Sequence, residues 1–167
     1  MISFVLTVVA IVLAAVIQST ALPHLAIVGV KIDLVVLLVV ACSIRRGIEL
    51  GLIWAVIGGI ALDVLSAGPF GVSVIGCTVA ALVAGSFGPT LRRTSALLPL
   101  ALTPLASIPA TLATAVAMAL VGWPILWPQT VALVVLPSAL LNSLAMFLVY
   151  PIVVEVDDRL AVSDWPG

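Results

Sequence analysis

Charge is almost absent from long stretches of this chain, and the few basic residues recur at regular intervals. Residues 1–30 contain no Lys, Arg, Asp or Glu, and arginine pairs at 45–46 and 92–93, followed by Arg159, separate apolar blocks of similar size. A helix that crosses a bilayer needs about 20 apolar residues. The pattern therefore predicts a protein that crosses a membrane several times.

The composition argues against a soluble fold. Apolar residues make up 64% of the chain and charged residues 8%, whereas a soluble domain has about 25% charged residues. Because so few polar side chains could not cover a water-exposed surface, we expect the lipid bilayer to surround most of the protein. The net charge of −1 and the lack of a basic face also exclude nucleic acid as a partner.

Hydropathy predicts an all-α, polytopic membrane protein with six transmembrane helices in a single domain over residues 1–167. The expected helices cover residues 2–20, 26–44, 47–65, 72–91, 96–121 and 129–154, with a tail at 155–167. The second helix reaches spanning length only if it starts near Ala26 and carries Lys31 and Asp33 in its first turns. A loop before a short, tilted helix is an equally good interpretation.

The basic residues also predict the orientation. With six spans, all five arginines lie on the same side as both termini, and Lys31 lies on the other side. Cytoplasmic loops are enriched in Lys and Arg, so the N- and C-termini should be cytoplasmic. Trp123 and Trp127 then lie at the outer interface, where indole rings anchor well.

Asp63, near the outer end of the third helix, is the residue that most invites a chemical role. It could be a proton or cation site, or it could accept hydrogen bonds from the turn at 66–71 or from the N–H groups that open the next helix. We favour hydrogen bonding, because a lone carboxylate is a poor general acid or base. Pairing with Asp33 as in an aspartyl peptidase lacks a supporting motif, and no catalytic, metal or cofactor site is expected.

Small residues repeat at three- to four-residue spacing on several helices, which lets helix backbones approach closely. Packing inside the bundle and binding of a partner helix both fit this pattern. The candidates for a partner interface are Ala10, Ala14, Gly51 and Gly58. The sequence leaves open whether two copies form a homodimer. Asn142, Ser138 and Ser143 are expected to bond between helices, whereas Gln18 is interpreted as an interfacial residue.

Short motifs within residues 18–85 resemble the rod-shape-determining MreD family. They include the segment 18–23 at the end of the first helix, the segment 31–34, and the Gly-Pro-Phe-Gly turn at 68–71. The residues that carry the resemblance are Asp33, Gly47, Gly51, Gly58, Asp63, Gly68, Pro69 and Gly71. Ile32 departs from the pattern, because the family often has proline there.

The resemblance implies a non-catalytic scaffold of the cell-elongation machinery in the bacterial inner membrane, acting in cell shape and sidewall peptidoglycan synthesis. It implies the bitopic protein MreC as the direct partner. MreB-like filaments and the peptidoglycan glycosyltransferase and transpeptidase are implied as indirect partners. It also implies the six-helix fold of the substrate-binding subunits of energy-coupling-factor transporters, without implying a ligand.

The alternative function is a substrate-binding membrane subunit of a vitamin-type transporter. That function requires a polar pocket open to the outside. The residues expected toward that face are Gln18, His24, Asp33, Asp63, Trp123 and Gln129. A water-filled cavity there would favour the transporter subunit, whereas an outer half filled by side chains would favour the scaffold.

Overall fold

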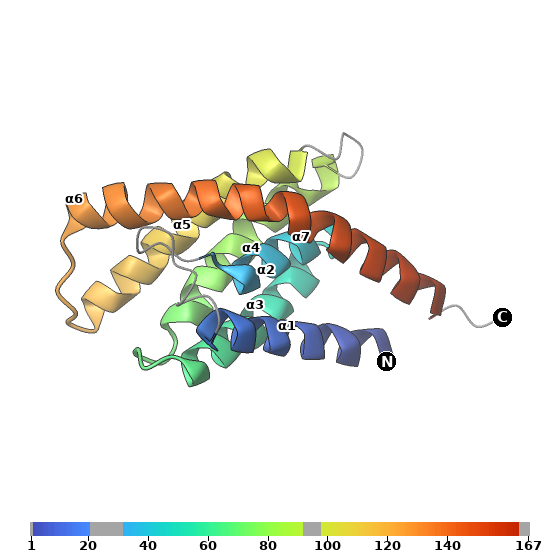
Figure 1. Ribbon diagram of the computed structural model, residues 1–167, viewed down its shortest axis with the longest axis horizontal. Helices are drawn as coiled ribbons and strands as arrows, with labels where there is room; N and C mark the ends of the chain where they lie inside the picture. The colour runs from blue at the N-terminus through green and yellow to red at the C-terminus, as the bar shows by residue number, and fades with distance from the viewer. Residues whose placement is uncertain (1, 21–31, 92–97, 164–167) are drawn as a thin grey trace.

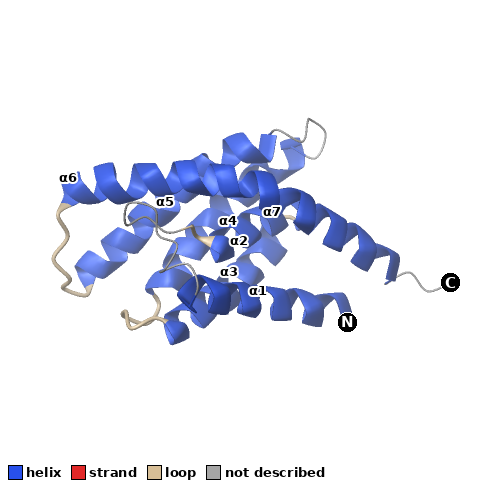
Figure 2. Ribbon diagram, viewed as in Figure 1, coloured by secondary structure: helices blue, strands red, loops and turns tan. Residues whose placement is uncertain are grey.

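All regular structure in the described residues, 2–20, 32–91 and 98–163, is helical in the computed structural model (Figures 1 and 2). The helices are α1 (Ile2–Thr20), α2 (Leu34–Arg46), α3 (Ile48–Leu65), α4 (Val72–Leu91), α5 (Leu98–Leu120), α6 (Trp127–Thr130) and α7 (Leu136–Ser163). A π-helical segment, η2 (Val131–Val135), joins α6 to α7. The all-α class is therefore confirmed.

Long apolar helices support a membrane location. Within the described residues, three helical stretches are long and apolar enough to cross a bilayer, namely Ile48–Leu65, Pro99–Leu120 and Trp127–Arg159. Shorter apolar stretches occur at Val5–Thr20 in α1 and Val72–Phe87 in α4. The count of six crossings stays a prediction.

Two helices differ from their predicted bounds. The second helix begins at Leu34, after non-helical Ile32 and Asp33, and not near Ala26; Lys31 lies outside the described residues. Its 13 residues extend about 20 Å, less than the roughly 30 Å of a bilayer core. The last helix continues through Ser163, so most of the predicted tail is helical.

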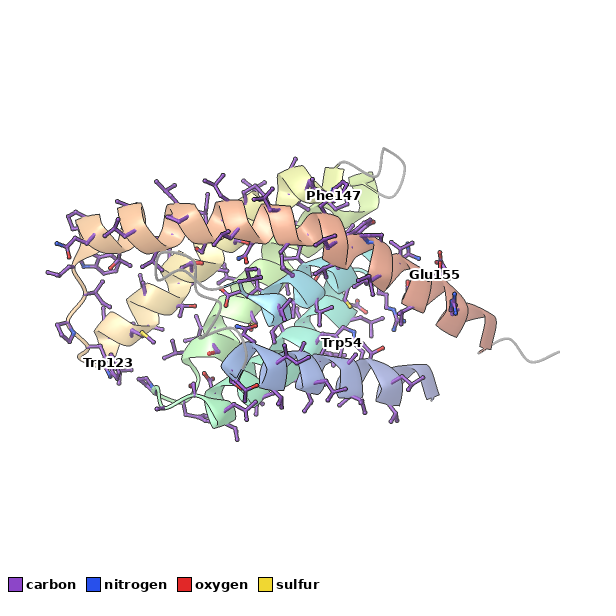
Figure 3. All side chains as sticks on the ribbon, in the orientation of Figure 1. Trp54, Trp123, Phe147 and Glu155 are labelled. Carbon is purple, nitrogen blue, oxygen red and sulfur yellow. The ribbon has the colours of Figure 1, made fainter. Side chains whose placement is uncertain are left out.

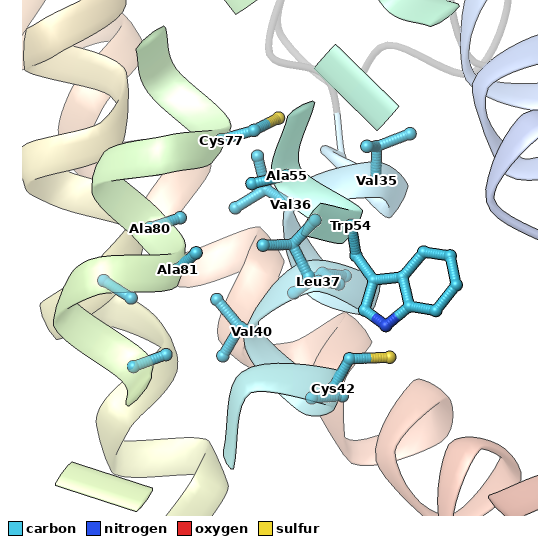
Figure 4. Close-up of a cluster of buried hydrophobic side chains, with 14 of the residues drawn as sticks. Val35, Val36, Leu37, Val40, Cys42, Trp54, Ala55, Cys77, Ala80 and Ala81 are labelled. Carbon is cyan, nitrogen blue, oxygen red and sulfur yellow. The ribbon is translucent and has the colours of Figure 1, made fainter. Parts of the chain in front are cut away.

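The short helix α2 forms the centre of the bundle. Nine of its 13 residues are buried, and it packs against α1, α3, α4, α5 and α7. Trp54 of α3 lies on one side of it, and Ala80 and Ala81 of α4 lie on the other (Figure 4). The neighbours therefore shield α2 from lipid almost completely, which explains how a helix of this length can lie inside a membrane protein.

Glycines allow close approach at three successive helix interfaces. A Cβ atom on Gly51 would lie 2.1 Å from Ser43 Oγ of α2, and one on Gly59 would lie 2.5 Å from Val74 Cα of α4. A Cβ on Gly76 would lie 2.2 Å from an oxygen of α5. The predicted small-residue packing within the bundle is thus present between α2 and α3, α3 and α4, and α4 and α5.

The two ends of the bundle are identified by the helices that begin or finish there. Helix α1 begins and α7 ends at the same end of the molecule (Figure 1), and Glu155 and Trp123 lie at opposite ends (Figure 3). We call the end of the bundle that contains the last residues of α2 and α7 the Arg45 end. The opposite end, where α3 is followed by α4, is called the Asp63 end.

We predict that Gly51→Ala lowers the free energy of unfolding by about 1–3 kcal/mol, because the new methyl group overlaps Ser43. The measurement is denaturant unfolding of the purified protein in detergent. Gly68→Ala is the control, since the nearest atom to its Cβ is 3.5 Å away. The double variant Gly51→Ala/Ser43→Gly should regain part of the loss; equal stability of Gly51→Ala and the wild type would contradict the prediction.

Candidate functional site

Side-chain amides surround the start of α2. Gln18 Nε2 donates to Asp33 Oδ1 at 2.8 Å, and Gln18 Oε1 accepts from the Val35 N–H at 2.9 Å. The Asp33 N–H donates to Asn142 Oδ1 at 3.0 Å, and Asn142 Nδ2 donates to Ser107 Oγ at 3.4 Å. This network joins α1, α2, α5 and α7.

The network satisfies backbone groups that water cannot easily reach. The first N–H groups of any helix lack partners within the helix, and leaving them unpaired away from water is costly. The role predicted for Asn142 is confirmed, since its fully buried side chain bonds to two other segments. The Ser138 and Ser143 hydroxyls instead donate to carbonyls of their own helical segment. Gln18 is more than an interfacial residue, because it bonds to Asp33.

The Asp63 carboxylate is hydrogen-bonded to the end of the turn between α3 and α4 and to the start of α4. Its Oδ2 accepts from the Gly71 N–H at 2.8 Å and its Oδ1 accepts from the Ser73 N–H at 3.0 Å, while the residue is only 4% exposed. The carboxylate therefore satisfies donors at the start of α4, where negative charge also suits the helix dipole. The hydrogen-bonding interpretation of Asp63 is confirmed.

The remaining motif residues build turns and contacts. Gly47 and Gly71 have φ values of 95° and 96°, a left-handed conformation that residues with a Cβ rarely adopt. Gly68 and Pro69 belong to the turn between α3 and α4, to which Asp63 is hydrogen-bonded. A Cβ on Gly58 would lie 2.6 Å from a side-chain carbon of Val35. These residues therefore shape the fold around α2 and α4.

A partly open polar cavity of about 230 Å³ lies near the Asp63 end, next to the Gln18–Asp33 pair. Residues from α1, α2, α3, α4 and α5, and from the segments directly before α2 and after α3, surround it. The polar residues in its lining are Gln18, Ser19, Asp33, Ser66, Ser73, Thr111 and Thr114, and the others are Val36, Leu62, Gly76, Cys77 and Ala110. In a chain this apolar, so many polar residues around one cavity mark a candidate binding site.

Ion pairs tie α2 to α7 at the Arg45 end. Arg45 Nε lies 2.8 Å from Asp157 Oδ2, and Arg46 Nε lies 2.6 Å from Asp157 Oδ1. Arg45 also pairs with Asp158. Sequence reasoning missed Asp157, because we assigned it to a tail beyond the last helix. The only signal was the cluster of acidic residues opposite an arginine pair in a chain with few charges.

The candidates for a partner interface divide into buried and exposed residues. Gly51, Gly58 and Ala14 are buried within the chain, whereas Ala10 is exposed and lines a second cavity of about 150 Å³ between α1, α2 and α7. This cavity is mostly apolar, with Leu6 and Ile152 among its lining residues, and the lining also includes Arg45 and Asp157. Ala10 is thus the candidate that another helix could reach directly.

Within the part of the chain that the structure describes, no three His, Cys, Asp or Glu side chains gather as a ligand set for a metal. Each oxygen of Asp63 already accepts a backbone hydrogen bond. The hydrogen bonds of Asp63 therefore serve the turn between α3 and α4.

Replacement of Asp63 should lower the free energy of unfolding, and the loss should be larger when more of its hydrogen-bond acceptors are removed. We expect Asp63→Ala to lower the free energy of unfolding by about 1–3 kcal/mol, because two partly buried N–H groups lose their partner. Asp63→Asn, which keeps one acceptor oxygen, should cost less. Thermal unfolding in detergent measures both; an Asp63→Asn variant as unstable as Asp63→Ala would show that the charge itself matters.

Asp157 and Asp158, at the Arg45 end, should contribute differently to the free energy of unfolding. Asp157 contacts two arginines with a side chain that is 19% exposed, whereas that of Asp158 is 63% exposed. We expect Asp157→Asn to lower the free energy of unfolding by about 1–3 kcal/mol and Asp158→Asn by less than about 1 kcal/mol. Equal losses in denaturant unfolding would contradict this ranking.

Comparison with known proteins places the chain in a family. A profile of the family described as rod shape-determining protein MreD matches residues 1–156. No curated protein and no solved structure matches the chain. The match covers most of the 167 residues, including the hydrogen-bond network at the start of α2 and the polar cavity, and it ends just before Asp157 and Asp158. The chain therefore belongs to the MreD family of rod-shape-determining bacterial membrane proteins.

Proposed function

We propose that this protein is a non-catalytic scaffold of the bacterial cell-elongation machinery, acting in cell shape and sidewall peptidoglycan synthesis. The observation that carries the proposal is the family match over residues 1–156. The described polar side chains support it, because they mostly join the chain's own helices. Gln18, Asn142 and Asp157 each bond to the region of α2.

The direct partner in this proposal is an MreC-like bitopic protein. Through it, the scaffold is linked to an MreB-like filament and to the peptidoglycan glycosyltransferase and transpeptidase. A bitopic partner offers a transmembrane helix, and helices associate in membranes where small residues allow close approach. The exposed Ala10, beside the apolar cavity between α1 and α7, fits such a contact.

The proposed location is the inner membrane, crossed several times, with both termini in the cytoplasm. The Arg45 end would then face the cytoplasm, in agreement with the enrichment of arginine in cytoplasmic segments. Helix α1 begins and α7 ends at that same end (Figure 1). The Asp63 end and its polar cavity would face the outside.

Co-purification from native membranes tests the scaffold function. We expect the tagged full-length chain to capture an MreC-like bitopic protein, and we expect Ala10→Phe to reduce that capture several-fold by filling the groove beside α1. Leu82→Phe is the control, because Leu82 is 43% exposed on α4, a helix that does not pack against α1. Normal capture by a stably folded Ala10→Phe variant would contradict this interface, and absence of the partner from the wild-type sample would contradict the function.

The polar cavity favours a second candidate, the substrate-binding subunit of a small-molecule transporter. Its lining combines a carboxylate, an amide and several hydroxyl groups near the end proposed to face outward, as a binding pocket would require. The same co-purification separates the candidates. A transporter subunit would bring down an ATP-hydrolysing module in place of an elongation protein.

A further inference from the structure

We propose that the ion pairs between α2 and α7 form a latch that keeps the groove between α1 and α7 narrow, and that the basic flank of a helix entering this groove releases it. The latch consists of Arg45 and Arg46 of α2 and of Asp157 and Asp158 of α7. The groove is the cavity of about 150 Å³ between α1, α2 and α7. The identity of the entering helix rests on the scaffold function proposed above, whereas the latch is a property of this chain alone.

The wall that α7 contributes to the groove lies beyond a proline. Pro151 is inside α7 and cannot donate to the carbonyl of Phe147 one turn earlier, and its ring crowds that carbonyl, so a helix bends readily there. Figure 1 shows that α7 changes direction along its C-terminal half. The α7 residues in the lining are Ile152, Val153, Val156 and Asp157. A bend at Pro151 therefore moves all of them together.

Apolar burial holds this part of α7 only weakly. Met146 is the last buried residue of α7, and the described side chains at 147–159 are half-buried or exposed. Segments with few buried apolar contacts open at low cost in free energy. On the other side of the groove, α1 packs extensively against α3 but little against α7. The groove is therefore bordered by a segment that the apolar core does not fix in place.

The ion pairs determine where this segment lies. Asp157 lines the groove, and its two oxygens lie 2.8 Å from Arg45 Nε and 2.6 Å from Arg46 Nε. Because α1 carries no charged side chain, these charges draw the end of α7 toward α2. Glu155 pairs with Arg159 inside α7, so this pair does not attach α7 to α2. The pairs of Asp157 thus set the width of the groove.

The groove in its present width is too narrow for a whole helix. A volume of about 150 Å³ admits single side chains, whereas a helix with its side chains is about 10–12 Å across. Ala10 on the α1 side leaves room for close approach. A helix that contacts both α1 and α7 therefore requires the end of α7 to move away from α1.

The entering helix can itself supply the charge that releases the latch. Asp158 pairs with Arg45 but is largely exposed, so a cation from another chain can reach its carboxylate. Cytoplasmic segments beside membrane-crossing helices are enriched in Lys and Arg, and the Arg45 end is the end proposed to face the cytoplasm. Exposed ion pairs are weak, so an added cation competes effectively with Arg45 and loosens the attachment of α7.

Distances between spin labels on the full-length protein in nonionic detergent test the latch. The native cysteines are first removed by Cys42→Ala and Cys77→Ala. One label is placed on α1 at Val9, and the second is placed on α7 either at Val156, beyond the proline, or at Leu148, before it. The wild-type side chains at all three label positions are exposed.

We expect Asp157→Asn to lengthen the distance from α1 to the Val156 label by about 3 Å. This estimate takes a bend of about 20° acting over about 7.5 Å of helix. The distance to the Leu148 label should not change. Arg46→Gln, which removes one of the two arginine contacts of Asp157, should lengthen the first distance in the same direction. Glu155→Gln is the matched control and should leave both distances unchanged, because Glu155 pairs only within α7.

The second arm tests release by a basic flank. Two synthetic peptides of about 20 leucines and alanines, long enough to cross a bilayer, carry a cluster of lysines or a cluster of glutamines at one end. We expect the lysine peptide to lengthen the distance from α1 to the Val156 label more than the glutamine peptide does. In Asp158→Asn the two peptides should act alike, because the exposed carboxylate is gone.

The proposal is overturned if folded Asp157→Asn and Arg46→Gln variants both keep the wild-type distances, or if the Leu148 label moves as far as the Val156 label. It is also overturned if Glu155→Gln widens the groove equally, or if the lysine peptide acts no more strongly than the glutamine peptide. If neither latch variant folds, added salt replaces them, since salt screens partly exposed pairs and must then lengthen the wild-type distance to Val156.

These results are distinguishable from failure of the scaffold function. The distances are measured without the native partner, so a sample that captures no bitopic protein can still show the latch. Conversely, a chain that captures the partner normally but whose α7 end does not move contradicts the latch alone.

Discussion

The length of α2 is the constraint on which the rest of the structure depends. With 13 residues, this helix is shorter than a bilayer core is thick, yet it lies at the centre of the bundle. A helix this short cannot reach both faces of the bilayer core, so at least one of its ends must finish within the bundle, where unpaired backbone and charged groups are expensive. The neighbouring helices supply partners for these groups at both ends.

Helix α7 provides a partner at each end of α2. Asn142 accepts from the Asp33 N–H at the start of α2, and Asp157 pairs with Arg45 and Arg46 at its finish. The helical rise separates these two α7 residues by about 22 Å, close to the length of α2 itself. Gln18 of α1 adds the remaining bonds at the start. The spacing of Asn142 and Asp157 along α7 thus matches the length of α2.

The sequence predicted the elements whose signals are local. The bounds of α1 and α4 agree with the predicted ranges, because uninterrupted apolar runs and a Gly-Pro turn define them. The bonds of Asp63 were also predictable, since the donors lie within ten residues of it. The start of α2 was ambiguous, because length favoured a long helix whereas Lys31 and Asp33 favoured a loop.

The features that sequence reasoning missed are contacts between distant segments. In the sequence, Gln18 resembles an ordinary interfacial residue. In the structure, the fold brings it within hydrogen-bond distance of Asp33 and Val35. In the sequence, Asp157 resembles part of a solvated tail. In the structure, α7 continues far enough for Asp157 to contact Arg45, 112 residues away in the chain. The cavity likewise depends on residues from five helices, and hydropathy carries no information on whether such residues enclose a space.

The double attachment of α7 to α2 has a mechanical consequence. A slide of α7 along α2 by one helical turn, about 5.4 Å, would break the bond at Asn142 and the pairs at Asp157 together. The two helices are therefore held in register, so a displacement of the last turns of α7 along its axis would also displace its contacts at the opposite end of the bundle. The amide network beside the polar cavity lies at that far end.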